Sequence, residues 1–210
     1  MSANIKPLRI ALTKGRLEKK TVELLEAAGY DCTAVREKGR RLILPVGENI
    51  EVVLAKAADV ITYVENGVCD LGVVGKDTIM ELGNSFYEIL DLGFGRCRFA
   101  VAGKTDGCEF SHIKTVATKY PNVTRRYFEG LSMDVRVIKI EGSVELAPLL
   151  SLADVIVDIV ETGSTLKENG LEVKSEVCPI SARMICNIAS MKLRKDEIEK
   201  LVSQIEEQIK

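Results

Sequence analysis

The chain has 210 residues, of which 46% are hydrophobic and 29% charged, and its formal net charge at pH 7 is -2. These values are typical of a globular protein, and the length allows one large domain or two small ones. The near-neutral charge excludes a general basic surface, so we expect neither nucleic acid nor an acidic membrane as a partner.

Six cysteines and a single histidine restrict the chemistry further. No two cysteines form a Cys-x-x-Cys pair and most are expected in apolar strands, so we predict reduced, buried thiols rather than a zinc site. Residues 1–7 lack the apolar centre of a signal peptide. No apolar run approaches the roughly 20 residues that span a membrane. The expected location is the cytoplasm.

Apolar runs separated by turn residues predict an alternation of strands and helices. Up to residue 92 we expect strands at 8–12, 42–45, 51–54, 71–74 and 86–90, with helices at 17–28, 59–66 and 77–82. Beyond it we expect strands at 97–102, 115–117, 135–140, 155–160 and 171–178. The helices there are predicted at 122–129, 144–152 and 195–209, with one or two helical turns at 166–169. This order predicts an α/β fold with mainly parallel sheets.

A weak internal repeat indicates two lobes. Residues 64–80 and 149–166 each contain a helix end, an aspartate, an apolar strand, a glycine and a threonine in that order. We therefore predict two similar α/β lobes, with 1–92 plus 181–210 forming lobe I and 93–180 forming lobe II. Because the chain would cross twice between them, a hinge and a ligand cleft between the lobes are expected.

The most informative stretch is 158–166, which reads Asp-Ile-Val-Glu-Thr-Gly-Ser-Thr-Leu. It joins a predicted strand to a predicted helix start, an arrangement that presents several backbone N–H groups to one anion. Thr162, Ser164 and Thr165 add hydroxyls, and Gly163 allows a ligand to approach the backbone closely. The stretch predicts a phosphate-binding loop, and it is not a Walker loop because it lacks a Gly-Lys-Ser/Thr ending.

Two acids accompany this loop, Asp158 and Glu161. Carboxylates repel a phosphate, so we expect them to hold another part of the same ligand. A ribose diol is one candidate and a magnesium ion (Mg2+) is the other. A sugar phosphate would engage both the hydroxyls and the acids. The alternative is an ordinary turn with a threonine cap and solvated acids.

Four cations are candidates for holding a polyphosphate. Lys14 and Arg16 flank a glycine at the end of the first predicted strand, where open α/β sheets bind ligands. Arg40 and Arg41 precede the next predicted strand. The planar fork of arginine suits phosphate oxygens. The alternative for each cation is solvated surface charge.

Two further segments are candidate ligand contacts. Asp70, Leu71 and Gly72 open an apolar strand, in which the glycine indicates close approach of a ligand or of another backbone. Asp70 could accept a hydrogen bond from an exocyclic amine, or serve as a cap. Glu141 ends the strand at 135–140 and is expected at the same edge as Asp158.

The only histidine, His112, lies in a polar stretch and is expected at the surface. A histidine-based nucleophilic triad is therefore not expected. No cysteine has a recognisable nucleophile context either. The residues favour a reaction driven by positioning and charge stabilisation rather than by covalent catalysis.

Four co-linear motifs together resemble the ATP phosphoribosyltransferases, and the likeness covers nearly the whole chain. They are Thr-Lys-Gly-Arg-Leu at 13–17, Cys-Asp-Leu-Gly-Val-Val-Gly-Lys-Asp at 69–77, Gly-Ser-Val-Glu-Leu-Ala-Pro at 142–148, and the loop at 158–166. The resemblance implies two α/β lobes with a cleft between them, like the type II periplasmic binding proteins. It also implies the first reaction of histidine biosynthesis, in which N1 of ATP attacks C1 of phosphoribosyl pyrophosphate (PRPP) with inversion, releasing pyrophosphate.

The resemblance implies roles for the candidate residues. The loop would hold the 5-phosphate of PRPP and the nearby acids its ribose hydroxyls, which assigns PRPP to Asp158, Glu161, Thr162, Gly163, Ser164, Thr165 and Glu141. The four cations would clamp the departing pyrophosphate together with Mg2+, for which no protein ligand is assigned, since the diphosphate itself would hold most of it. ATP would contact Asp70, Leu71 and Gly72.

The length adds one expectation. The family has a long form with a C-terminal regulatory domain, and this sequence ends directly after its closing helix, so it resembles the short form. Short forms depend on a regulatory subunit that resembles histidyl-tRNA synthetase and assemble with it as a hetero-octamer. Histidine feedback would then lie mostly in the partner.

The sequence leaves three rival functions. A non-catalytic solute-binding module of the same fold is one, since fold does not give function, but it has little use for cations and a sugar-phosphate loop. A phosphoribosyltransferase for another base usually carries adjacent acids in its loop, whereas Asp158 and Glu161 are three positions apart. A structural or regulatory paralogue would be expected to lose the loop or the cations.

Overall fold

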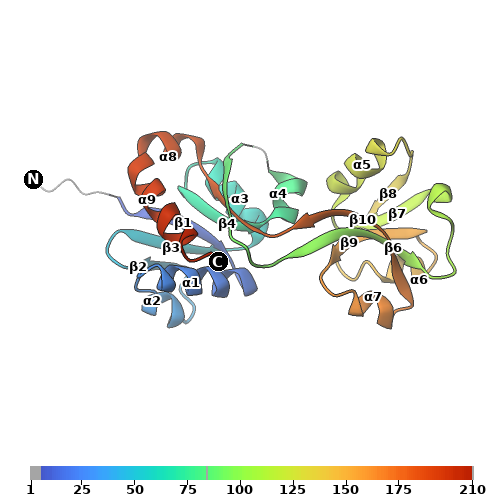
Figure 1. Cartoon of the computed structure of the whole chain (residues 1–210), viewed down its shortest axis with the longest axis horizontal. Helices are drawn as coiled ribbons and strands as arrows, with labels where there is room; N and C mark the ends of the chain where they lie inside the picture. The colour runs from blue at the N-terminus through green and yellow to red at the C-terminus, as the bar shows by residue number, and fades with distance from the viewer. Residues whose placement is uncertain (1–5, 84, 210) are drawn as a thin grey trace, which may run out of the picture. The chain divides into compact units, whose positions relative to one another are not determined.

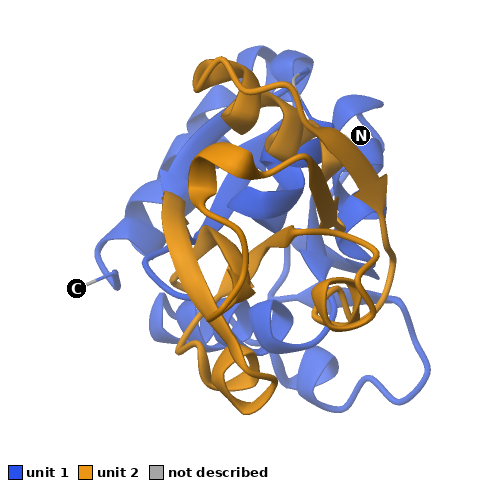
Figure 2. Ribbon diagram, turned by 90° about the vertical axis from the view of Figure 1, so that its right-hand side faces the viewer, with its two compact units in different colours: residues 1–95, 181–210 blue, residues 96–180 orange. Residues whose placement is uncertain are grey.

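The computed structural model describes residues 6–83 and 85–209. The chain forms two compact α/β units, residues 1–95 with 181–210 and residues 96–180, coloured separately in Figure 2. Each unit contains its own β-sheet (Figure 1). The prediction of a two-lobed α/β fold is confirmed. The expectation that residues 1–7 contain no signal-peptide centre falls mostly on residues 1–5, which lie outside the described residues.

Unit 1 is built on a six-stranded sheet in the order β2-β3-β1-β4-β11-β5. Its strands are β1 (Leu8–Thr13), β2 (Ile43–Val46), β3 (Ile50–Ala55), β4 (Leu71–Gly75), β5 (Tyr87–Asp91) and β11 (Ala182–Cys186). Its helices are α1 (Arg16–Ala27), α2 (Thr33–Arg36), α3 (Ala57–Glu65), α4 (Lys76–Leu82), α8 (Ile188–Leu193) and α9 (Lys195–Glu206).

Helices cover both faces of this sheet, because successive strand residues point to opposite faces. Leu12 of β1 belongs to a cluster with Leu25 of α1 and Leu201 of α9. The neighbouring Ala11 belongs instead to a cluster that contains Val60 of α3. Ile198, Leu201 and Ile205 of α9 are therefore buried in the core of unit 1.

Unit 2 is built on a five-stranded sheet in the order β10-β6-β9-β7-β8. Its strands are β6 (Cys97–Lys104), β7 (Thr115–Thr118), β8 (Arg136–Lys139), β9 (Val155–Val160) and β10 (Leu171–Ile180). Its helices are α5 (Pro121–Gly130), α6 (Leu146–Leu149) and α7 (Ser164–Glu168), with a 3₁₀ turn η1 at Phe110–His112. Strands β8, β7 and β9 run parallel to one another, so the loops that follow them emerge at one edge.

The prediction of mainly parallel sheets is wrong. Among the described strands, two of the five pairings in unit 1 and two of the four in unit 2 are parallel. β6 and β10 carry the chain into and out of unit 2 and pair antiparallel. Parallel neighbouring strands need a crossover connection, usually a helix, to return the chain to the same end of the sheet. Antiparallel neighbours need no such crossover.

Four elements were missed or misjudged. The sequence reading did not predict α2, β11 or α8. The helix predicted at 144–152 is only Leu146–Leu149, because Pro148 lacks an N–H donor and Ser151 has a positive φ of 57°. The other predicted strands and helices are present, with ends within a few residues of the expectation.

The six cysteines are all unbridged, as predicted, but they are less buried than expected. Cys32, Cys69 and Cys186 are buried, and desolvation raises the pKa of their thiols to about 11, about 11 and about 12. Cys108 is exposed. Among the described residues no helix has the length and apolarity needed to cross a membrane.

Gly72 sits where helix α3 packs closely on β4, and this contact generates a prediction. A Cβ at Gly72 would lie 2.8 Å from side-chain atoms of both Val60 and Val64. We expect Gly72→Ala to lower the free energy of unfolding by about 1–3 kcal/mol through overpacking, measured by urea denaturation. Gly130→Ala is the matched control, since a Cβ there meets nothing within 4 Å. Equal stability of the two variants would contradict the close packing of α3.

Candidate functional site

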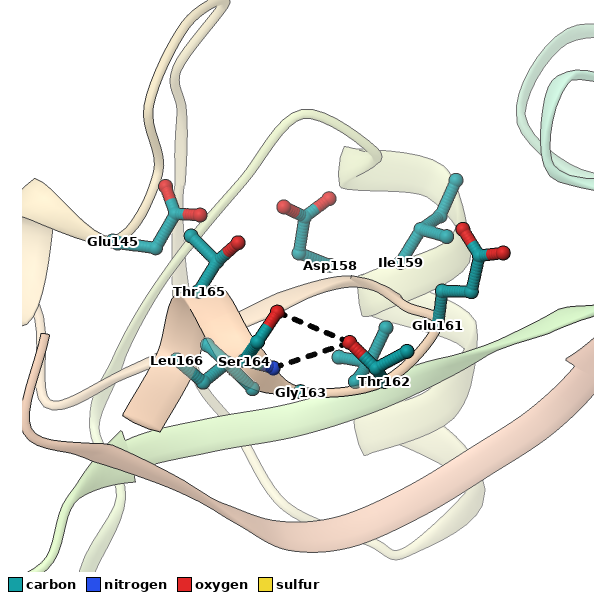
Figure 3. A pocket seen from close by; sticks show the side chains of 10 residues that line it. Glu145, Asp158, Ile159, Glu161, Thr162, Gly163, Ser164, Thr165 and Leu166 are labelled. Carbon is teal, nitrogen blue, oxygen red and sulfur yellow. Dashed lines mark hydrogen bonds between the residues drawn. The ribbon is translucent and has the colours of Figure 1, made fainter. Parts of the chain in front are cut away.

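The loops at the carboxyl edge of the parallel strands in unit 2 enclose two cavities. The first, here called the cradle cavity, has a volume of about 270 Å³ and is lined by Glu145 and residues 158–166 (Figure 3). The second, the side cavity, measures about 460 Å³ and is lined by residues 119–120, 141–143, 145 and 158–159. Because both are lined by Glu145, Asp158 and Ile159, the two cavities adjoin.

The loop at 162–165 has the backbone that the sequence predicted. Gly163 has φ 81° and ψ 5°, the left-handed conformation that glycine adopts without strain. The hydroxyls of Thr162 and Ser164 lie 3.1 Å apart, and the N–H of Ser164 donates to Oγ1 of Thr162 at 3.4 Å. Leu166 is buried in the core of unit 2 and anchors the loop. Thr162, Ser164 and Thr165 are themselves exposed and available to a ligand.

Helix α7, which follows this loop, is only five residues long. A helix of one and a half turns has little macrodipole, since that field comes from many aligned peptide units. The anion-binding capacity of the cradle cavity therefore rests on its hydroxyls and loop N–H groups. The side chain of Asn169 donates to the carbonyl of Thr165 at 2.8 Å and closes the helix.

The acids of the cradle cavity lie at different places along its rim. Asp158 belongs to β9, opposite Ala100 of β6 in the strand register. In the view of Figure 3 its carboxylate and that of Glu145 lie on the same side of the loop, above the hydroxyl of Thr165. Glu161 is exposed and lies at the other end of the loop. The structure thus brings Asp158 together with an acid that the sequence analysis had not selected.

Glu141 lines the side cavity together with Asp158, so strands β8 and β9 bring these two candidates to one edge. An ion pair with Lys139 at 2.7 Å holds Glu141. The hydrogen bond and the charge of Lys139 lower the pKa of Glu141 below its ordinary value. The carboxylate is thus ionised and its charge is partly neutralised.

Lys119, Tyr120 and Glu145 line these cavities but were missed by the sequence reading. Lys119 and Tyr120 directly follow β7, so the rule that ligands bind beyond the carboxyl ends of strands could have found them. Tyr120 packs edge-on against the buried ring of Phe99, with centroids 4.9 Å apart. The sequence reading placed Glu145 in the motif at 142–148 and in a predicted helix, but did not select it as a site residue.

In unit 1, two of the cation-bearing segments meet at Glu18. Gly15, with φ 99°, begins α1, and its N–H donates to Oε2 of Glu18 at 3.4 Å. The other carboxylate oxygen of Glu18 forms an ion pair with Lys38, and only 7% of the Glu18 side chain is exposed. The turn that carries Lys14 and Arg16 is therefore tied to the turn that follows α2.

Arg40 and Arg41 lie on that second turn and both are exposed. The guanidinium of Arg41 donates to the carbonyl of Glu37 at 3.1 Å and to that of Lys38 at 3.3 Å. These bonds hold the turn closed and occupy part of the donor fork of Arg41. Lys14 and Arg16 are exposed as well. The fold of unit 1 thus gathers the predicted cations on two linked turns.

The segment predicted to contact ATP has structural partners in unit 1. Asp70 accepts hydrogen bonds from Ser190 at 2.7 Å, from the N–H of Arg9 at 2.9 Å and from Arg194 at 3.1 Å. Leu71 has no exposed surface, and Gly72 is buried against α3. The close approach that Gly72 indicated is that of a helix. Asp70 also lines a cavity of about 220 Å³, and the contact of these three residues with ATP stays a prediction.

The described residues contain no group of three or more histidine, cysteine or acidic side chains that could hold a metal ion. A complete protein cage for Mg2+ is therefore not formed by that part of the chain. Asp158 and Glu161 offer one or two carboxylates, the number found where Mg2+ is bound mainly through substrate phosphates. The donor set is compatible with an ion that arrives with a phosphorylated ligand. His112 lies at the surface, with 73% of its side chain exposed.

The fold defines the class of protein to which the chain belongs. The structure superposes on the periplasmic VFT2 domain of BvgS from Bordetella pertussis with a TM-score of 0.56, covering 99% of this chain and 90% of that one. At 15% identity this likeness concerns the fold alone. The chain is thus a two-lobed α/β protein whose fold also occurs in a periplasmic domain.

Closer relatives identify the family. The family "HisG: ATP phosphoribosyltransferase" matches residues 56–207. The chain is 60% identical over 205 residues to the ATP phosphoribosyltransferase of Clostridium kluyveri, covering 96% of this chain and 94% of the relative. That of Clostridium botulinum strain 657 is 54% identical over 213 residues, with 98% and 100% covered. The chain belongs to the ATP phosphoribosyltransferase family, and it aligns over nearly the full length of these short-form relatives.

A solved structure agrees with this assignment. The ATP phosphoribosyl transferase (HisG:HisZ) complex from Thermotoga maritima contains a chain that superposes with a TM-score of 0.82 at 36% identity, covering 96% of this chain and 97% of that one. The family transfers the phosphoribosyl group of PRPP to N1 of ATP, the first step of histidine biosynthesis. This chain is accordingly a pentosyltransferase, and the rival of a non-catalytic binding module is set aside.

Proposed function

We propose that the cradle cavity of unit 2 holds the ribose 5-phosphate part of PRPP during this reaction. The observation that carries the proposal is the lining of one small cavity by both a hydroxyl-rich loop and carboxylates. Thr162, Ser164 and Thr165, with the backbone N–H groups around Gly163, bind the phosphate. Asp158 accepts hydrogen bonds from the ribose, with Glu161 and Glu141 at the margins of the cavities. A phosphate alone would give the acids no partner, whereas a sugar phosphate gives them hydroxyl donors.

The cations of unit 1 act on the diphosphate of the same substrate. Lys14, Arg16 and Arg40 are exposed on the two turns tied by Glu18, and Arg41 supports the second turn through its bonds to carbonyls. Negative charge on the diphosphate grows as the C1–O bond breaks. Cations placed there stabilise the transition state more than bound PRPP, which raises turnover rather than affinity alone.

The chemistry needs no general base to create the nucleophile. N1 of adenine supplies a lone pair that forms the new bond to C1 of the ribose, while the electron pair of the C1–O bond leaves with pyrophosphate. The protein's task is to hold the two substrates in line and to stabilise the departing charge. The surface position of the only histidine is consistent with such a mechanism. When bound, Mg2+ neutralises part of the diphosphate charge.

We also propose a partner. The Thermotoga maritima protein is described as a HisG:HisZ complex, and its matching chain is 36% identical to this one. By this likeness the chain assembles with a regulatory subunit resembling histidyl-tRNA synthetase, as a hetero-octamer. Both substrates are intracellular metabolites, which supports a cytoplasmic location.

The reaction and the partner are tested in one assay. Purified chain is mixed with ATP, PRPP and Mg2+, with and without the synthetase-like subunit, and the absorbance of phosphoribosyl-ATP is followed. We expect product in both mixtures, formed faster with the subunit. Absence of product in both would contradict the proposed function, and equal rates would contradict dependence on the partner.

The leaving-group role of Arg16 makes a separate prediction. Arg16→Ala should lower kcat by about 100-fold, the typical loss when one donor to a developing charge is removed. The affinity for PRPP, measured by calorimetry, should change far less. Lys20→Ala, which alters an exposed cation on the same helix that pairs with Glu23, is the control and should leave kcat unchanged. Equal losses in kcat and affinity for Arg16→Ala would refute the role.

For the loop of the cradle cavity we predict a loss of PRPP affinity rather than of turnover. Thr162→Val with Thr165→Val removes two hydroxyls and keeps the side-chain shape. Since a hydrogen bond to a charged group contributes about 1.5–3 kcal/mol, the affinity for PRPP should fall at least tenfold. Thr105→Val, at an exposed position outside both cavities, is the matched control. Unchanged binding of PRPP by the double variant would show that the phosphate lies elsewhere.

A further inference from the structure

Glu18 is a nearly buried acid that joins two separate segments of unit 1. It lies in the first turn of α1, and only 7% of its side chain is exposed. One carboxylate oxygen accepts a hydrogen bond from the N–H of Gly15 at 3.4 Å. The other forms an ion pair with Lys38, which lies 20 positions further along the chain. The carboxylate therefore links the start of α1 to the turn that follows α2.

The segment that begins at Lys38 is a closed β-turn. The N–H of Arg41 donates to the carbonyl of Lys38 at 3.0 Å, and the guanidinium of Arg41 donates to the same carbonyl at 3.3 Å. Gly39 has a φ of 55°, which glycine adopts in such a turn without strain. Arg40 thus lies in the middle of a turn whose first residue is bound to Glu18, and its backbone position follows that of Lys38.

The other segment carries Lys14 and Arg16 on either side of a glycine. The N–H of Lys14 donates to the carbonyl of Ala55 at 2.9 Å, which fixes the end of β1 to the neighbouring strand. The chain then turns at Gly15, with φ 99°, and α1 begins at Arg16. Since Glu18 holds the N–H of Gly15, the direction in which the chain enters α1 is set on both sides of the turn.

A buried ion pair of this kind is a poor source of stability. Taking two charges out of water costs free energy that their attraction returns only in part, so the gain for folding is often small. What the pair supplies is geometry, because each oxygen of Glu18 is directed at one segment. Exposed cations on both segments also repel one another, and a carboxylate bound to both offsets part of that repulsion. The link thus lies where cations are gathered.

We infer that Glu18, together with Lys38, is a positioning residue for the cations that stabilise the departing diphosphate. The inference deepens the proposed function and rests on it, since the charges that it places are those assigned to the leaving group. Glu18 acts through Arg16 and Arg40 rather than on the substrate. The link consists of the chain's own groups, so the substrate does not have to assemble this arrangement. A misplacement of about 1 Å in such an arrangement can cost about 100-fold in rate.

The test is a double-mutant cycle in the assay of phosphoribosyl-ATP formation, with the synthetase-like subunit present. Glu18→Gln keeps the size of the side chain and removes the charge that binds Lys38. We expect it to lower kcat about tenfold, less than Arg16→Ala does, because the cation is displaced rather than removed. The KM for PRPP should change far less. In a chain that already carries Arg16→Ala, Glu18→Gln should lower kcat by at most about threefold, since coupled residues are not additive.

A merely structural role for Glu18 would give a different pattern. If Glu18→Gln lowered kcat by the same factor with and without Arg16→Ala, the two effects would be independent and the inference would be overturned. An unchanged kcat for Glu18→Gln alone would overturn it as well. Glu23→Gln is the matched control, since Glu23 is an exposed acid of the same helix that pairs with Lys20, and it should leave kcat unchanged.

Lys38 offers a second measurement that does not alter the acid. Its side chain is 35% exposed, so replacements there can be accommodated at the surface. Lys38→Met removes the ion pair, whereas Lys38→Arg keeps a cation that can restore it. We expect kcat to fall in Lys38→Met and to be largely retained in Lys38→Arg, with thermal unfolding recorded for both. Equal values of kcat in these two variants would contradict the positioning role.

Arg16→Ala distinguishes failure of this inference from failure of the proposed function. If Arg16→Ala left kcat unchanged, the role of the cations at the diphosphate would fall, and the inference with it. If Arg16→Ala lowered kcat and Glu18→Gln did not, only the positioning role of Glu18 would fall. A loss in Glu18→Gln that largely disappears in the Arg16→Ala background is the result that supports the inference.

Discussion

The parallel pairing of β9 with β7 and of β7 with β8 is the constraint on which the rest of unit 2 depends. Parallel strands end at the same edge, so the loops after all three meet there and enclose the cradle and side cavities. The hydroxyl of Thr118, which is fully buried at the end of β7, donates to the carbonyl of Val157 at 2.7 Å and ties β7 to β9. A shift of one residue in this register would turn every side chain of the edge to the opposite face.

The candidate charged side chains differ in sign between the two units, with carboxylates in unit 2 and cations in unit 1. Unit 2 places carboxylates beside a hydroxyl-rich loop, a combination that suits a sugar phosphate and repels a bare polyphosphate. Unit 1 gathers exposed cations on two turns that the buried acid Glu18 ties together through Gly15 and Lys38. PRPP carries both a sugar phosphate and a diphosphate, and the proposal assigns one of these groups to each set of side chains. The same fold occurs in the BvgS domain at 15% identity, and the fold by itself does not give the function.

Asp70 and Glu145 show why an acid's role depends on its surroundings. Asp70 directly precedes strand β4, and Glu145 directly precedes helix α6. From the sequence alone, either acid could cap its element or bind a ligand. In the folded unit 1, Asp70 is occupied by Ser190 and Arg194, residues 120 and 124 positions away. Glu145 has no such partner in the described chain and faces a cavity. Sequence reasoning selected Asp70 as an ATP contact, which stays a prediction, and did not select Glu145.

The sequence by itself determined the local structure and the family. Periodicity and turn residues located most strands and helices, Gly163 and its hydroxyl neighbours marked the loop, and four co-linear motifs indicated an ATP phosphoribosyltransferase, which the comparisons show. Only the tertiary structure decided which strands run antiparallel, that β11 inserts between β4 and β5, and which acids face a cavity. The reason is physical: turns and periodicity depend on residues a few positions apart, whereas the pairing of β11 with β4 and the ion pair of Asp70 with Arg194 join residues more than 100 positions apart.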